Sequence, residues 1–285
     1  MKWILYIGLA AVFLTNSPSL WARSTHSKVA LAGQFKSVAL ICTEHSLSRA
    51  ASVAIGPKLF LTAAHIFFND AGAWRAFLEK HGPQITTSHM YEIDGFVLQE
   101  KNLQSVFING QKKVLKKLYI PLAHLTAVGM KPVNYDLAIV ELEEPHNLPI
   151  TPIYTSGETG TEYTIVGFGP PIFDLTVGKK NNDVCLRPVP TKYWAQNRGL
   201  LTKIDETWKL TGDKHTVPNG RSGTTKGDSG GPLLNSKGQI LGISSYVLEN
   251  TGPNNELLSN YTSSFMALDD EKIKDFLSRI PFEQP

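Results

Sequence analysis

The sequence predicts an all-β fold that ends in an α-helix. The chain of 285 residues contains 23 glycines and 17 prolines, and turns rich in these residues separate many short β-prone runs. Short strands at this spacing, with few long helical periods, are typical of a β-sandwich or a β-barrel. The runs span residues 37–42, 52–55, 58–64, 91–98, 105–108, 136–142, 162–169, 207–212, 232–235, 239–247 and 263–268.

A proline-rich bend divides the chain into two halves of similar size. The segment 143–152, EEPHNLPITP, contains three prolines, which do not fit inside a central strand. We therefore expect an N-terminal β domain over residues 23–150 and a C-terminal β domain over residues 151–285.

Three segments depart from the β pattern. Apolar residues at helical spacing in 71–82 predict a short helix within a long loop, and the Pro-, Asn- and Lys-rich stretch 170–200 predicts an extended loop. The segment 267–280, ALDDEKIKDFLSRI, predicts an amphipathic helix that Asp269 or Asp270 caps. Its apolar stripe, which we expect to dock on the β domain, consists of Leu268, Ile273, Phe276, Leu277 and Ile280.

Composition and charge exclude several classes of protein. A hydrophobic content of 42% and a charged content of 19% are those of a globular protein rather than a disordered one. The formal charge of +3 is too small to indicate a nucleic-acid partner. The run QKKVLKKL at 111–118 could attract anionic lipid or nucleic acid through its four lysines, but we interpret it as a solvated face. We expect no nucleic-acid partner, and the oligomeric state stays open.

The first residues predict a secretory signal peptide rather than part of the fold. Lys2 supplies the positive start, 3–14 is an apolar run, and a polar stretch with small residues at Ala22 and Ser24 follows. The apolar run is too short to span a bilayer, and a buried N-terminal helix is the alternative. We therefore expect residues 1–22 to be removed, with cleavage near residues 22–24. The mature protein is then secreted or periplasmic, without stable insertion in a membrane.

The chain has only two cysteines, Cys42 and Cys185. An exported protein of this size with one possible bridge must be stabilised mainly by its core, unlike small disulfide scaffolds. Sequence spacing leaves open whether the two cysteines are bonded.

One short stretch, TTKGDSGGPLL at 224–234, places Ser229 among three glycines, Gly227, Gly230 and Gly231. The glycines could simply permit a turn with positive φ, or they could let backbone N–H groups surround a nucleophile. A serine hydroxyl needs a base to act as a nucleophile, and a histidine base needs a carboxylate to hold its tautomer. His65 stands at the end of the apolar run LFLTAAH, and Asp136 opens the apolar run DLAIVEL. They are the candidates for the base and the carboxylate.

The ordered set LTAAH, DLAIVEL and GDSGGP resembles the trypsin-like (chymotrypsin-fold) serine peptidases over roughly residues 35–280. The resemblance implies two six-stranded antiparallel Greek-key β-barrels followed by a C-terminal helix. The first barrel would carry His65 and Asp136, and the second would carry Ser229. It also implies that no metal or organic cofactor takes part.

The resemblance also assigns roles to the site residues. His65 would be the general base, Asp136 its orienting carboxylate and Ser229 the nucleophile, with the amides of Gly227 and Ser229 as the oxyanion hole. Ser245 would also hydrogen-bond the buried aspartate, and residues 245–247 would pair with an extended substrate. The residues expected to contact the substrate are Gly223, Thr224, Lys226, Ser245, Tyr246 and Val247.

Some positions depart from the family pattern. Ile66 and the stretch SRAAS (48–52) stand where a disulfide beside the histidine is common, which indicates a bacterial-type or divergent member. No family-type N-terminus follows the signal, so the usual amine partner of Asp228 is in doubt.

The expected function is that of an exported serine endopeptidase acting on polypeptide substrates. Gly223 replaces the acid that binds Arg or Lys, and Ser244 replaces the histidine of several glutamate-specific relatives. We expect a preference for small or medium uncharged side chains. The alternative is a proteolytically weak or inactive binding or adhesion module on the same fold, and an esterase is a third reading.

Overall fold

The computed structural model describes the chain in several stretches. These are residues 28–43, 49–67, 85–87, 90–94, 105–121, 124, 135–156, 161–169, 192–198, 201–213, 224, 227–251 and 257–282. The expected signal peptide, the expected helix at 71–82 and Cys185 lie outside them. None of the helices in these stretches is long and apolar enough to cross a membrane.

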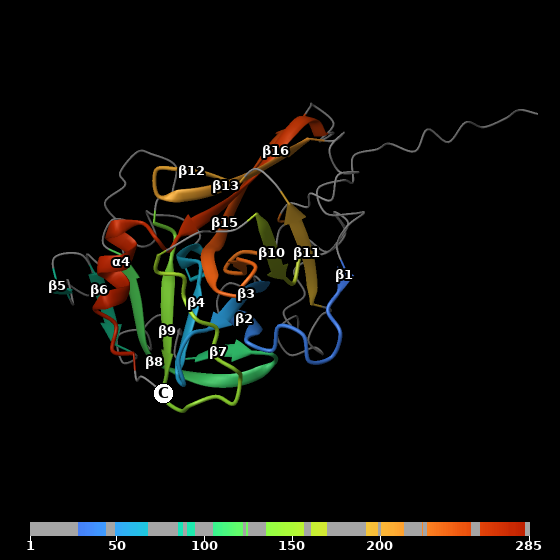
Figure 1. Cartoon of the computed structure of the whole chain (residues 1–285). Helices are drawn as coiled ribbons and strands as arrows, with labels where there is room; N and C mark the ends of the chain where they lie inside the picture. The colour runs from blue at the N-terminus through green and yellow to red at the C-terminus, as the bar shows by residue number, and fades with distance from the viewer. Residues whose placement is uncertain are drawn as a thin grey trace, which may run out of the picture.

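The first sheet is built from the N-terminal half of the chain and closes on itself. Its strand order is β5-β6-β8-β7-β2-β3-β4-β9, and a further antiparallel pairing between β8 and β9 closes six of the strands into a barrel (Figure 1). The strands are β2 (Val38–Thr43), β3 (Arg49–Ala54), β4 (Leu59–Thr62), β5 (Ile85–Thr87), β6 (Met90–Asp94), β7 (Ser105–Ile108), β8 (Gln111–Pro121) and β9 (Ala138–Leu142).

The second sheet contains the later strands and one strand from the start of the described chain. Its order is β1-β11-β10-β14-β15-β16-β13-β12, and all its ladders are antiparallel. The strands are β1 (Lys28–Val29), β10 (Glu162–Gly167), β11 (Tyr193–Arg198), β12 (Leu201–Ile204), β13 (Thr207–Asp213), β14 (Pro232–Leu234), β15 (Ile240–Thr251) and β16 (Leu257–Ala267).

The predicted all-β class with two barrels and a C-terminal helix is confirmed, with two differences in detail. No ladder joins the outer strands β1 and β12 within the described residues, so the second barrel is not closed there. A further difference is that β1, near the start of the chain, joins the second sheet rather than the first.

Five strands, β1, β5, β8, β11 and β12, form in segments without a strand prediction, and two of these segments were interpreted otherwise. β8 covers the lysine-rich run 111–118, and its side chains are buried from Leu118 onwards because the strand pairs with neighbours on both sides. Asn109 and Gly110, with φ of 50° and 79°, form the two-residue turn that joins it to β7. The expected loop over 170–200 is wrong for residues 193–198, because these form β11 by pairing with β10 and β1.

The C-terminal helix α4 (Glu271–Ser278) confirms the prediction for 267–280. Asp270 is the N-cap, and its carboxylate accepts hydrogen bonds from the amides of Lys272 and Ile273. The five residues of the expected apolar stripe are all buried.

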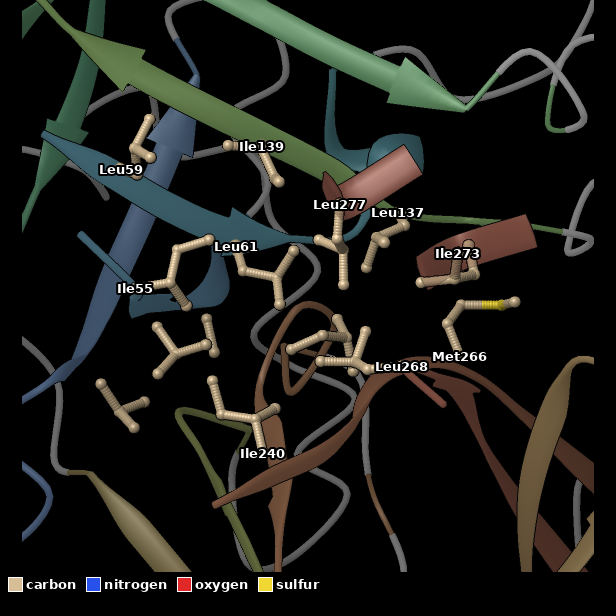
Figure 2. Packing of buried hydrophobic residues seen from close by; sticks show 14 of the residues in the cluster. Ile55, Leu59, Leu61, Leu137, Ile139, Ile240, Met266, Leu268, Ile273 and Leu277 are labelled. Atoms are coloured by element: carbon tan, nitrogen blue, oxygen red, sulfur yellow. The ribbon is translucent and has the colours of Figure 1, made fainter. Parts of the chain in front are cut away.

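The stripe of α4 packs in a core that lies between the two sheets (Figure 2). Leu61 and Ile139 enter this core from the first sheet, and Ile240 and Met266 enter it from the second. Each sheet also has a core of its own, around Phe60 in the first and Phe265 in the second. The middle core therefore fixes the two sheets and the helix to one another.

Candidate active site

His65 lies just beyond the end of β4, in a single turn of 3-10 helix (Ala64–Ile66). Ala63 and Ala64 are fully buried, so the backbone at the strand end is closely packed on the first sheet. The His65 side chain itself is 36% exposed and can be reached from solvent. The two buried alanines thus place a closely packed backbone behind an accessible imidazole.

Asp136 lies two residues before β9, and its side chain is only 1% exposed. The amide of His65 donates to Oδ1 over 2.9 Å, and His65 Nδ1 lies 2.7 Å from Oδ2. Ser245 on β15 donates its hydroxyl to the same Oδ2 over 2.5 Å. The buried carboxylate is thus satisfied by donors from both sheets, as a buried charge requires.

Ser229 lies in a tight turn that leads into β14. Gly231 N donates to Asp228 O over 2.8 Å, and Gly230 has a φ of 78° at the third position of this turn, typical of a type II turn. Ser229 Oγ lies 3.0 Å from His65 Nε2, on the side of the ring opposite Asp136. The structure therefore brings together the three side chains that the sequence places far apart.

The turn around Ser229 is packed directly on the first sheet. Ala51 N, on β3, donates to Ser229 O over 2.7 Å, and Thr62 Oγ1 donates to Ala51 O over 2.8 Å. A Cβ on Gly230 would overlap both Ala51 O and Thr62 Oγ1. The glycine is needed for this close approach between sheets as well as for its positive φ.

Asp228, whose amine partner was in doubt, is fully buried and accepts a hydrogen bond from Gly169 N over 2.9 Å. Its carboxylate lies against Gly167, where a Cβ would overlap Oδ1. Gly227, with a φ of 102°, packs against Gly169. A backbone amide after β10 is therefore one donor that holds the turn preceding Ser229.

The pKa values of the His65–Asp136 pair are shifted in opposite directions. Burial favours the neutral carboxyl of Asp136, but the charge and hydrogen bond of His65, with smaller effects of His124 and Ser245, hold its pKa below the ordinary value. Burial also favours neutral His65, but the Asp136 charge and hydrogen bond raise the pKa of the imidazole above 6.5. The pair favours an ionised carboxylate that stabilises an imidazolium.

The residues expected to contact the substrate are only partly within the described chain. Gly223 and Lys226 lie outside it. Thr224 is buried, and its amide donates to Ser263 Oγ over 2.9 Å. Tyr246 and Val247 lie on β15, opposite Ser264 and Ser263 of β16.

Several residues of the site were not expected from the sequence. His124 is 3% exposed, and its charge helps to lower the pKa of Asp136. Nothing in its local sequence, PLAHL, indicates this role. Thr62 lies in the run 58–64, which predicts a strand and gives its hydroxyl no role in the site. Gly167 and Gly169 lie at the end of the run 162–169, which predicts a strand and assigns neither glycine a place in the site.

A hydroxyl, an imidazole and a buried carboxylate lie in hydrogen-bonded series between two β-sheets, which is the arrangement of chymotrypsin-fold proteins. The comparisons agree with this class. The model of the Trypsin family matches residues 29–269, and the chain belongs to this family of trypsin-like serine peptidases.

Solved structures show the same fold at low sequence identity. A Glu endopeptidase is similar with a TM-score of 0.52 and 15% identity, over 89% of this chain and 95% of the other. Human heparin binding protein is similar with a TM-score of 0.50 and 17% identity, over 91% and 99% of the two chains. No curated protein matches the chain significantly.

Proposed function

We propose that the protein is an exported serine endopeptidase that hydrolyses peptide bonds through an acyl-enzyme on Ser229. The observation that carries this proposal is the series of contacts from Asp136 Oδ2 to His65 Nδ1, at 2.7 Å, and from His65 Nε2 to Ser229 Oγ, at 3.0 Å. These are the distances at which a general base can take the proton of a nucleophile.

In the first half of the reaction, Ser229 Oγ attacks the peptide carbonyl and its proton passes to His65 Nε2. Asp136 stabilises the imidazolium so formed, and the amides of Gly227 and Ser229 stabilise the oxyanion. The C–N bond then breaks as His65 returns the proton to the leaving amine. The same imidazole then takes a proton from a water molecule, whose oxygen attacks the acyl carbon. The bond from that carbon to Ser229 Oγ breaks as His65 returns the proton to Oγ.

An extended polypeptide has a place to pair on the second sheet. β15 pairs with β14 through Ile243, and backbone hydrogen bonds join Ser244 to Gly230 and Gly231. Beyond that point the described ladders of β15 run to β16 alone. Residues 245–247 therefore offer backbone groups for strand addition next to Ser229.

The preference for small or medium uncharged side chains belongs to the same proposal. Uncharged Thr224 and Ser263 lie together near Val247, and Gly223 and Lys226 provide no acidic partner for a basic side chain. A peptide library would show this preference as cleavage after uncharged residues. Strong cleavage after Arg, Lys or Glu would contradict it.

The export of the protein and its division at residue 150 are proposed on the sequence features given above. Secretion with loss of residues 1–22 is tested by N-terminal sequencing of the protein recovered outside the cytoplasm. An N-terminus at Met1 would contradict it.

The catalytic proposal is tested with a fluorophosphonate probe and a protein substrate. The purified mature protein should be labelled on Ser229 and should cleave the protein. The Ser229→Ala variant should fold with an unchanged circular dichroism spectrum, remain unlabelled and lose turnover by at least about three orders of magnitude.

Two other outcomes would contradict the proposal in different ways. A folded wild-type protein that does not react with the probe would indicate a binding or adhesion module on the same fold. Labelling with ester turnover but no cleavage of proteins or peptides would indicate an esterase.

A further inference from the structure

The backbone immediately before Asp136 has an unusual conformation. Tyr135 has a φ of 55°, in the left-handed region that bulky side chains rarely adopt. Leu137 N donates to Tyr135 O over 2.7 Å, which closes a three-residue turn with Asp136 at its centre. The direction of the Asp136 side chain is therefore set by a turn that Tyr135 would not favour by itself.

The first turn of α4 contacts Tyr135 from the C-terminal end of the chain. Lys272 Nζ lies 5.3 Å from the centroid of the Tyr135 ring. The hydrogen bond to Tyr135 and then the charge of Tyr135 are the main causes that raise the pKa of Lys272, with smaller effects of Asp270 and Glu206. Lys272 is exposed, and its backbone amide is tied to the N-cap carboxylate of Asp270.

The residue that follows Asp136 is held by the same helix. Leu137 is fully buried in the core between the sheets, and Figure 2 shows it beside Leu277 of α4. Ile273 of α4 belongs to the same core, and the Tyr135 side chain packs against this core. α4 therefore holds the chain on both sides of Asp136, one side by polar contact and the other by apolar packing.

We propose that Tyr135 and Lys272 are positioning residues for Asp136. The contact with α4 keeps Tyr135 in its left-handed conformation, and this conformation aims the carboxylate at His65. The inference rests on the proposed function of Ser229 and adds a role for the C-terminal helix in it. A small rotation of the Asp136 turn would lengthen the 2.7 Å contact with His65 Nδ1 and weaken the base.

Two variants remove the contact in different ways. Tyr135→Gly removes the ring and leaves a residue that adopts positive and negative φ with similar ease, so the turn is no longer held in one conformation by α4. Lys272→Met removes the cation from an exposed position. Lys274→Met makes the same change at another exposed position of α4, away from Tyr135, and is the matched control.

The measurement is the rate constant of Ser229 labelling by a fluorophosphonate, followed as a function of pH. We expect Tyr135→Gly to react about tenfold more slowly, Lys272→Met to react more slowly by a smaller factor, and Lys274→Met to react like the wild type. In the two slow variants the midpoint of the acid limb should move down towards 6.5, because Asp136 is what raises the His65 pKa. His124 and Ser245, which also face Asp136, are unchanged in all variants. Lys272→Arg should restore the rate.

Rates and midpoints like those of the wild type in both Tyr135→Gly and Lys272→Met would overturn this assignment while leaving the proposed function intact. A lower thermal unfolding midpoint of these variants with an unchanged pH profile would also overturn it. The contact between Tyr135 and Lys272 would then stabilise the fold without positioning Asp136. A wild-type protein that does not react at all would overturn the proposed function, and this assignment with it.

Discussion

Asp136 is the residue on which the electrostatics of the site depend. It is buried, it faces His65 over 2.7 Å, and it raises the pKa of that imidazole while its own pKa is lowered. An ionised acceptor at this position both selects the tautomer of His65 and stabilises its protonated form.

Replacing this carboxylate by an amide should therefore abolish most activity. We expect Asp136→Asn to lower kcat by about four orders of magnitude, because the amide can present an N–H to the wrong tautomer of His65. In the wild type, activity should rise with pH through a midpoint above 6.5, because His65 must be neutral to act as the base. In Asp136→Asn, the midpoint of the residual activity should lie at a lower pH, because the charge that raises the His65 pKa is gone. Kinetics on a peptide substrate across pH measure both effects. Glu143→Gln, at an exposed acid, is the control, and an unshifted midpoint in Asp136→Asn would contradict the assignment.

Gly230 shows how much of a glycine requirement comes from packing between the sheets. Its φ is 78°, and a Cβ would overlap Ala51 O and Thr62 Oγ1, whereas Gly238, with a φ of 76°, has open space around it. We expect Gly238→Ala to lower the free energy of unfolding by about 1 kcal/mol through φ alone, and Gly230→Ala by clearly more. Urea denaturation of the two variants compares them directly. Equal losses would show that the contact with the first sheet contributes nothing.

At the scale of elements, the N-terminus of α4 is capped by one side chain, that of Asp270. Asp270 accepts from the amides of both Lys272 and Ile273, which otherwise have no partner inside the helix. Asp270→Ala should lower the free energy of unfolding by about 1 kcal/mol, and Asp270→Asn, which can still cap, should lower it much less. Thermal or urea unfolding of the pair tests this. If alanine and asparagine are equally destabilising, the effect comes from the charge and not from the cap.

The elements also show which sequence patterns were sufficient. The run SVFI coincides with β7, and the apolar stripe of α4 is buried as its spacing predicts, because local periodicity decides which face of an element meets the core. β8 was missed although Asn109-Gly110 is a strong hairpin signal, because four lysines concealed its alternation. β11 could not be expected, because it is stabilised by pairing with strands far away in the sequence.

At the scale of the whole molecule, the start of the described chain joins the two sheets. Lys28 and Val29 pair with β11 in the second sheet, and β2 begins in the first sheet at Val38. Between them, the ring centroids of Phe35 and Trp194 lie 5.7 Å apart. Lys192 Nζ donates to Phe35 O over 2.7 Å at the base of this connection.

Burial lowers the pKa of Lys192 to about 8, from 10.5. The folded protein therefore releases this proton at lower pH than the unfolded chain, so Lys192 should make the free energy of unfolding increase between about pH 8 and pH 10.5. The increase is moderated by solvent, because the side chain is only half-buried. Urea denaturation across this window should show the rise in the wild type and in Lys36→Met, an exposed lysine of the same connection, but not in Lys192→Met. Parallel curves for all three proteins would contradict it.

The sequence by itself determined the β character of the chain, its closing helix and the three residues to which chemistry could be assigned, because strand periodicity, capping and the setting of Ser229 are local properties. The tertiary structure decided what surrounds those residues: the donors to Asp136 from two sheets, the backbone amide that reaches Asp228, and the contact of α4 with the Asp136 turn. These depend on packing between segments that are distant in the chain. Packing of that kind follows from the shape and burial of the assembled core, and no stretch of residues encodes it alone.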